Sequence, residues 1–198
     1  MIKRLGVSIL IYRIHPNIKH FLMLHLDGDK ARVALVEDTD FYMDERPIPY
    51  AADWQVMEVD FQDAYGGGEK LFPDISANVG KLFLSERAYT TFKDLLAGLG
   101  EVLPVRYADQ KGYVFNCLKT VSAVGELSVH DPLNDRFSAA FDNSADGVVL
   151  YKSDTDLNGH FCSEVFRKVV LENGLTGVCF SEDLGNPFPE ELGMKVSH

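Results

Sequence analysis

The sequence lacks an apolar run long enough to cross a membrane, and it lacks a surplus of positive charge. Its most apolar stretch near the start, "LGVSILIYRI", is only ten residues long and contains Arg13, and the chain carries 30 acidic residues against 19 basic ones. A membrane-spanning helix needs about 20 predominantly apolar residues. Nucleic acids and anionic membranes repel a protein whose net charge is −11. We therefore expect neither nucleic acid nor a membrane among its partners.

Cysteine is also scarce, with only Cys117, Cys162 and Cys179 in 198 residues. An odd number of cysteines in a chain of this size indicates free thiols in a reducing cytoplasm. Motifs of hydrolases are missing as well, since neither a Gly-x-Ser-x-Gly elbow nor a His-Glu-x-x-His pair occurs. We expect no catalytic, cofactor-binding or metal-binding residues and a cytoplasmic location.

The composition is that of an ordinary folded domain, with 46% hydrophobic and 25% charged residues. We expect one compact unit with three regions along the chain. These are an acidic N-terminal region at 1–70 that contains a hairpin, a core at 71–182, and a tail at 183–198.

Two segments have the caps and the apolar spacing of amphipathic helices. Ser85 and Glu86 open a helix expected over about 86–98, which Gly98 and Gly100 end. Ser163 and Glu164 open a second helix over about 164–172, which Asn173 and Gly174 end. The first helix has its apolar stripe at Tyr89, Phe92, Leu95, Leu96 and Leu99, and the second at Val165, Phe166, Val169 and Val170.

Most of the remaining chain is rich in β-forming residues. "VLPVRY", "GYVFNCLKTVSAV", "RFSAAF", "GVVLY" and "LTGVCF" predict short strands separated by turn residues. Asp27, Gly28 and Asp29 lie between two apolar runs, which predicts a hairpin. The fold class is therefore α+β, a mixed or antiparallel sheet of short strands with the two helices packed on it.

The chain start allows two interpretations. The apolar residues up to Ile14 predict a buried strand, because Arg13 and His15 interrupt the run and no signal-cleavage site follows. Alternatively "IKHFLML" at 18–24 begins the folded part, and the first 17 residues are an appendage.

One turn resembles half of a calcium-binding loop. Asp154, Asp156, Asn158 and Gly159 match the first half of an EF-hand loop, but the twelfth position is Val165 where a bidentate glutamate is needed. The same residues also suit a hairpin turn that uses Asp and Asn side chains to fix its backbone.

His160 and Cys162 raise the possibility of a thiol nucleophile. Residues two apart on a strand share a face, so an imidazole there could stabilise a thiolate. The alternative is a partly buried turn histidine beside a core cysteine.

Negative charge is concentrated between Asp27 and Asp63, which holds eleven acidic residues against three basic ones. The same stretch contains five aromatic residues, and aromatics among charges of one sign suit an interface with a basic protein partner. The alternative is a solvated face whose aromatics point into the core. The residues we expect at this interface are Glu37, Asp38, Asp40, Tyr42, Asp44, Glu45 and Trp54.

The order of several motifs resembles the eleventh immunity-protein family of bacterial polymorphic toxin systems. These motifs are Pro73-Asp74, Ser85-Glu86, Pro104, Tyr113 with Asn116, Ser163-Glu164, and Leu175-Thr176-Gly177 with Phe180. The resemblance covers about residues 72–180, and no single motif in it is diagnostic.

The resemblance implies a protein that binds a cognate toxin domain and neutralises it by occlusion, without catalysis. It carries over no catalytic residues, and the acidity of the chain suggests that the toxin domain is basic. Two alternatives remain open. One is a small hydrolase that uses the Cys/His pair, and the other is a regulatory binding module unconnected with toxins.

Overall fold

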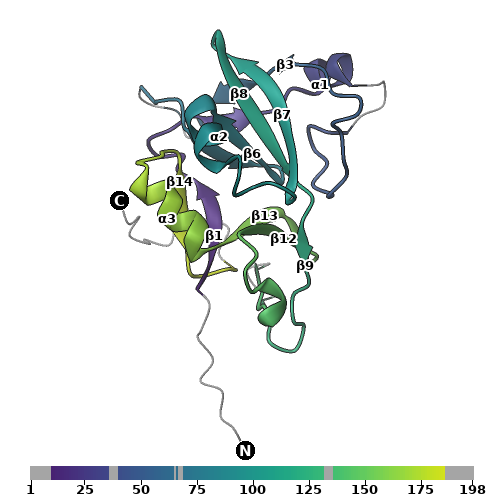
Figure 1. Ribbon diagram of the computed structural model, residues 1–198, viewed down its shortest axis with the longest axis vertical. Coiled ribbons are helices and arrows are strands. Elements are labelled where there is room, and N and C mark those ends of the chain that lie inside the picture. Colours follow the sequence, from purple (N-terminus) through teal and green to yellow (C-terminus); the bar gives the residue numbers. More distant parts are fainter. Residues whose placement is uncertain (1–9, 36–39, 65, 67–68, 132–135, 186–198) are drawn as a thin grey trace, which may run out of the picture.

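A computed structural model describes residues 10–35, 40–64, 66, 69–131 and 136–185 (Figure 1). Its helices are α1 (Gly28–Ala34), α2 (Glu86–Phe92) and α3 (Glu164–Glu172), with a 3-10 turn η1 (Asn143–Ala145). Its first seven strands are β1 (Ile11–Pro16), β2 (Met23–His25), β3 (Met57–Glu58), β4 (Asp60–Gln62), β5 (Ile75–Asn78), β6 (Lys81–Ser85) and β7 (Gly100–Tyr107). The others are β8 (Gln110–Cys117), β9 (Thr120–Val121), β10 (Val129–Asp131), β11 (Arg136–Ser138), β12 (Leu150–Ser153), β13 (Asp156–Ser163) and β14 (Val178–Ser181).

Two five-stranded sheets form the framework of the described residues. One has the order β3-β7-β8-β6-β5 and the other the order β14-β1-β13-β12-β9. Most neighbours are antiparallel, while β3 with β7 and β9 with β12 are parallel. The expected α+β class with mixed sheets of short strands is therefore confirmed. None of the helices in the described part of the chain is both long and apolar enough to cross a membrane.

Strand β1 lies inside the second sheet, between two strands from the other end of the chain. Tyr12 pairs with Cys162 of β13, and His15 pairs with Cys179 of β14. The buried strand expected near the start is therefore present at 11–16, and these residues are not an appendage. The boundary expected at residue 70 stays a prediction, although β1 joins the first region to strands of the second.

The first sheet is buried on both faces because successive side chains along its strands belong alternately to two apolar clusters. On one face Leu82, Leu84 and Phe115 contact α2 and α3 within one cluster. On the other face Phe83 and Val114 pack against the segment from Leu24 to Phe61. A third cluster, around Tyr151 and Phe161, covers the outer face of the second sheet. The residues between Leu24 and Phe61 thus form one layer of the molecule, on one face of the first sheet.

Helix α3 has the predicted bounds, and helix α2 is shorter than predicted. The stripe of α3 meets that of α2 where the rings of Phe166 and Phe92 stack, with centroids 4.4 Å apart. Helix α2 ends at Phe92, after which only separate helical bonds remain, such as Leu96 N–H to Phe92 C=O at 2.9 Å. Leu95, Leu96 and Leu99 still pack into the core, so the stripe predicted their burial correctly and the helix length wrongly.

The hairpin predicted around Gly28 is wrong, because a helix follows the turn. The Asp27 carboxylate accepts hydrogen bonds from the N–H groups of Asp29 (2.8 Å) and Lys30 (3.0 Å), which makes Asp27 the N-cap of α1. Ala31 and Ala34 then face the core three positions apart. Strand β2 pairs with β4 instead of with the residues that follow it.

Candidate functional site

We call the stretch from Asp27 to Asp63 the acidic segment. It has no helix or strand between residues 40 and 56, yet buried side chains bind its backbone. Lys81 of β6 donates to the carbonyl of Asp44, and Lys152 of β12 donates to the carbonyl of Glu45 at 2.7 Å. Both lysines are completely buried. The acidic segment is therefore attached to both sheets at two consecutive residues.

Two further side chains continue this attachment toward residue 51. The Glu101 carboxylate accepts the N–H groups of Tyr50 (2.7 Å) and Ala51 (3.0 Å). Buried Asn116 donates its amide to the carbonyl of Ile48 at 2.7 Å and to Glu101 at 3.2 Å. We call Lys81, Lys152, Asn116 and Glu101 the clamp. Because the clamp satisfies main-chain groups that a strand would otherwise pair, residues 44–51 keep one conformation without joining a sheet.

Burial changes the protonation of the clamp lysines. Desolvation, followed by repulsion from Lys152, lowers the pKa of Lys81 to about 7. Desolvation also lowers the pKa of Lys152. The Lys81 ammonium lies 4.6 Å from the centre of the Phe41 ring, whose π face favours a cation.

The structure separates the predicted interface residues into different environments. Asp40 is exposed, Tyr42, Glu45 and Trp54 are half-buried, and Asp44 is buried. Glu37 and Asp38 lie outside the described residues. Only some of the predicted set can therefore offer a side chain to a partner.

The carboxylate of Asp44, one of the predicted interface residues, is bound within the protein. Arg46 binds both of its oxygens, at 2.8 and 2.7 Å, and the Tyr50 hydroxyl donates to it at 3.0 Å. The hydrogen bonds from Arg46 lower the pKa of Asp44 to about 2, despite the opposing effect of burial. Asp44 shapes the segment and does not present a charge.

The two predicted aromatics also have internal roles. Trp54 donates its indole N–H to the carbonyl of Pro104 at 2.9 Å, and its ring contacts buried Phe41 with centroids 4.9 Å apart. Tyr42 lies against Gly28 and beneath the Arg32 guanidinium, which is 5.5 Å from the ring centre. For these rings the alternative interpretation, packing toward the core, is largely correct.

Ion pairs within the segment engage three of its eleven acidic residues. Its three basic residues each pair with an acid of the same segment: Lys30 with Asp60 at 2.6 Å, Arg32 with Asp29 at 3.2 Å, and Arg46 with Asp44 at 2.7 Å. Asp40, Asp53 and Glu58 are exposed, and no ion pair joins them to the described residues. We call these three the free carboxylates.

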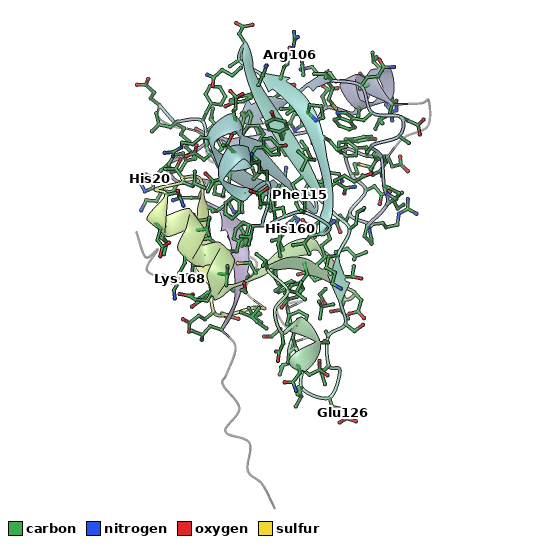
Figure 2. All side chains as sticks on the ribbon, in the orientation of Figure 1. His20, Arg106, Phe115, Glu126, His160 and Lys168 are labelled. Atoms are coloured by element: carbon green, nitrogen blue, oxygen red, sulfur yellow. The ribbon has the colours of Figure 1, made fainter. Side chains whose placement is uncertain are left out.

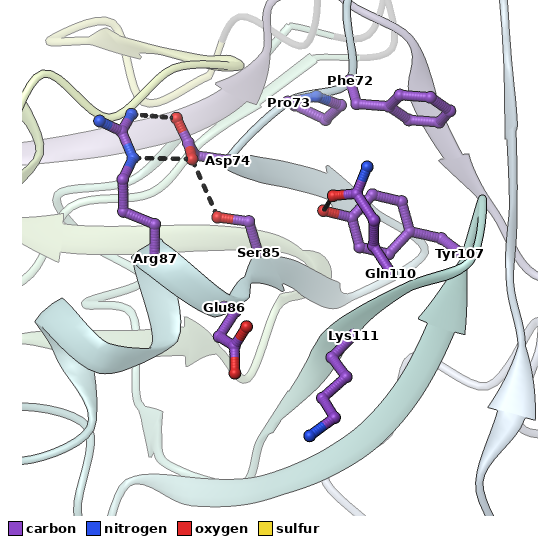
Figure 3. A pocket seen from close by; sticks show the side chains of 9 residues that line it. All are labelled: Phe72, Pro73, Asp74, Ser85, Glu86, Arg87, Tyr107, Gln110 and Lys111. Carbon is purple, nitrogen blue, oxygen red and sulfur yellow. Dashed lines mark hydrogen bonds and ion pairs between the residues drawn. The ribbon is translucent and has the colours of Figure 1, made fainter.

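Three of the motifs of the family resemblance, Pro73-Asp74, Ser85-Glu86 and Leu175-Thr176-Gly177, meet around the half-buried carboxylate of Asp74, which Figure 3 shows. Asp74 accepts hydrogen bonds from the Ser85 hydroxyl at 2.9 Å, from Arg87 at 3.1 and 2.5 Å, and from the N–H and hydroxyl of Thr176 at 3.0 and 2.9 Å. Gly177, with φ of 100°, lies so close to Pro73 that a Cβ would fall 2.2 Å from the proline Cβ. The sequence motifs thus form a junction between β5, α2 and the loop before β14.

A cleft of about 450 Å³ opens beside this junction. Figure 3 shows Glu86 and Lys111 pointing into it from opposite sides, with the rings of Phe72 and Tyr107 along one wall. The bonds of Asp74 are all made within the protein. We therefore assign the motif residues a role in stability.

His160 and Cys162 do not form an accessible nucleophilic site. Both are fully buried, and Figure 2 shows His160 in the interior of the molecule, on β13 of the second sheet, where it pairs with Ile14 of β1. Burial lowers the pKa of His160 well below its usual value and raises the pKa of the Cys162 thiol well above it. The alternative was correct for Cys162, which is a core cysteine, and wrong for His160, which is fully buried within β13 and is not a partly buried turn residue.

The turn with Asp154 is the hairpin between β12 and β13, as the alternative to a calcium loop predicted. Asp154 accepts the N–H of Ala123 at 3.0 Å, and Asp156 accepts the N–H of Gly159 at 2.8 Å while it pairs with Arg13 at 2.8 Å. Asn158 accepts the N–H of Gly80 at 3.2 Å. These oxygens fix the backbone of the turn and of its neighbours.

The clamp was not predicted from the sequence. Lysine is mostly exposed in proteins, so no general rule selects Lys81 or Lys152 as buried. The one available signal is that Lys81 and Lys152 each adjoin an apolar run, "KLFL" and "VVLYK".

Comparison with models of known protein families and with curated proteins finds no match for this chain.

Proposed function

We propose that this chain is an immunity protein that binds a basic toxin domain through the acidic segment and neutralises it by occlusion. The segment binds and the rest of the molecule supports it. The chain performs no catalysis of its own in this proposal. It acts in the cytoplasm, where its three buried cysteines stay as free thiols.

The observation that carries the proposal is the combination of the free carboxylates with the clamp. Asp40 and Asp53 each precede one of two rings in contact, Phe41 and Trp54, so the chain brings them to the same part of the surface. The clamp holds residues 44–51, and backbone bonds connect both carboxylate residues to that stretch, from Asp44 N–H to Asp40 C=O at 2.7 Å and from Asp53 N–H to Tyr50 C=O at 3.2 Å. A surface ordered in advance loses little conformational entropy on binding, which favours tight association.

The Asp74 junction supports the same proposal indirectly. It accounts for the Pro-Asp, Ser-Glu and Leu-Thr-Gly motifs as parts of a scaffold. A scaffold shared among proteins that neutralise different toxins needs its specificity elsewhere. The acidic segment lies outside the resembling residues 72–180 and is the place we assign to specificity.

The test uses the gene beside the one for this chain. We expect that gene to encode a large secreted protein with a C-terminal toxin domain. Co-expression of this chain should restore growth of cells that produce the toxin domain, and the two purified proteins should form a stable complex. A toxin domain that still kills the cells and forms no complex would overturn the proposal. Binding of a partner that is not toxic would instead favour the regulatory module.

A further inference from the structure

An open groove lies between α1 and the edge strand β3, next to the acidic segment. Four aliphatic side chains line it: Val33 and Ala34 of α1, Met57 of β3, and Val56, which precedes β3. Its volume is about 420 Å³. Pockets that hold small ligands or side chains have volumes of roughly 300–1,000 Å³. The groove is therefore large enough to accept a side chain from another molecule.

The exposed valines of this groove do not stabilise the protein itself. Val33 is 84% exposed and Val56 is 55% exposed. Helix α1 already contacts the core through Ala31 and Ala34, and valine is a weaker helix former than lysine, arginine, glutamine or glutamate. Local stability therefore gives no reason for an aliphatic side chain at position 33.

The rim of the groove is acidic. The Asp29 side chain is 95% exposed, and its pair with Arg32 at 3.2 Å is a surface pair between neighbouring turns, which contributes little and exchanges readily. Glu58, one of the free carboxylates, lies on the β3 side. Lys30 also lines the groove, but its ammonium is bound to Asp60 at 2.6 Å.

We propose that this groove binds an aliphatic side chain of the toxin domain, flanked by lysine or arginine residues that pair with Asp29 and Glu58. The inference rests on the proposed function, since the toxin domain is the basic partner. The inference adds which side chains of the toxin domain make the contact: one aliphatic side chain between two cationic ones. A buried aliphatic anchor slows dissociation, while the flanking charges accelerate association.

Two substitutions test the anchor. Val33→Gln with Val56→Gln keeps the volume of the walls and removes their apolar character, and it should raise the dissociation rate of the toxin complex at least about tenfold, or roughly 1.4 kcal/mol. The matched control is Leu127→Gln with Val129→Gln, which are 64% and 63% exposed and lie outside the groove. Control and wild type should dissociate alike. Unchanged dissociation of the groove variant would overturn the inference while leaving the proposed function standing.

A second measurement does not depend on the toxin. In an NMR titration with the capped peptide Lys-Leu-Lys, the methyl resonances of Val33 and Val56 should shift, and with Glu-Leu-Glu they should not. These shifts in the absence of toxin binding would keep the groove as a site for basic apolar segments and remove only the immunity proposal. Equal responses to both peptides, or none, would count against the groove.

Discussion

The Lys152 ammonium of strand β12 donates a hydrogen bond to the backbone carbonyl of Glu45 at 2.7 Å, across 107 positions of sequence. The bond is partly buried and joins a sheet made largely from the two ends of the chain to the acidic segment. Lys81 makes the equivalent bond from the other sheet, to the preceding carbonyl. The conformation of the segment therefore depends on both sheets being formed.

Replacing Lys81 should remove a pH dependence of stability. Its folded pKa of about 7 is below the usual 10.5, so between these values the unfolded chain binds a proton that the folded chain has lost. Stability of the wild type should rise with pH in this window, by up to about 1.4 kcal/mol per pH unit for one proton. Urea unfolding between pH 7 and about 8, below the usual thiol pKa of about 8.5, measures this slope.

In the Lys81→Met variant the slope should be smaller by that amount. The exposed lysine at 119 provides the control, since Lys119→Met should leave the slope of the wild type unchanged. Parallel curves for Lys81→Met and wild type would show that the Lys81 ammonium is not desolvated as its burial implies.

Asp74→Ala should destabilise the protein strongly. Without the carboxylate, the Ser85 hydroxyl, Arg87 and the Thr176 N–H lose their acceptor, and hydrogen bonds to a charged group contribute about 1.5–3 kcal/mol. We expect a loss on the order of 3 kcal/mol in chemical unfolding. Asp94→Ala, at an exposed position, is the control and should change stability by less than about 0.5 kcal/mol. A loss as small for Asp74→Ala would contradict the role given to the junction.

Acid should weaken the same junction. Burial raises the pKa of Asp74, but the hydrogen bonds from Arg87, Thr176 and Ser85 outweigh it, so the pKa lies below the usual 3.8. The stability that this shift supplies is complete above pH 3.8 and is lost as pH falls through the folded pKa. Asp74→Asn should remove this dependence.

Reversing the free carboxylates should slow association with the toxin domain. Asp40→Lys, Asp53→Lys and Glu58→Lys together leave Asp44 and its internal bonds intact. Association at low salt should slow about tenfold or more, and the difference should shrink at physiological salt, where screening acts beyond about 8 Å. Dissociation should change less, as measured by surface-immobilised binding kinetics.

The control carries the same charge change on exposed residues elsewhere, with Asp94→Lys, Glu126→Lys and Glu172→Lys. If both triple variants associate equally slowly, only net charge matters and the acidic segment has no special role. If neither differs from wild type, the toxin domain binds another surface.

Cys162→Ala and His160→Ala should each lower stability and leave binding intact. Both side chains are fully buried, so truncation creates a cavity that costs about 1–3 kcal/mol. The folded variants should protect cells from the toxin as the wild type does. Loss of protection by a variant that circular dichroism shows to be folded would support the hydrolase alternative.

The sequence predicts best those elements whose bounds depend on residues close to them in the chain. Helix α3 begins after Ser163 and ends at Asn173-Gly174 as predicted, although the Ser163 side chain makes no capping hydrogen bond and Val165 of the predicted stripe is 51% exposed. Helix α1 was missed because Asp27-Gly28 suits a hairpin turn and a helix N-cap equally well. The residues after Asp29 decide between a hairpin and a helix, and their apolar run was interpreted as a strand.

The clamp and the junction depend on contacts between distant residues, for which one sequence holds no local signal. Lys152 reaches Glu45 only because β12 and the acidic segment meet in the folded state. The predicted interface stays a prediction, but the sequence did not show that Asp44 is paired with Arg46, because counting charges does not tell which of them are paired.

The position of β1 between β13 and β14 bears on how the protein forms during synthesis. Both partner strands follow it by well over a hundred residues. At the usual 5–20 residues per second, β1 waits on the order of ten seconds for its neighbours. During that time it is an apolar strand with two unpaired edges, open to pairing with other chains. Protection from a toxin would therefore begin only after each copy of the chain is nearly complete.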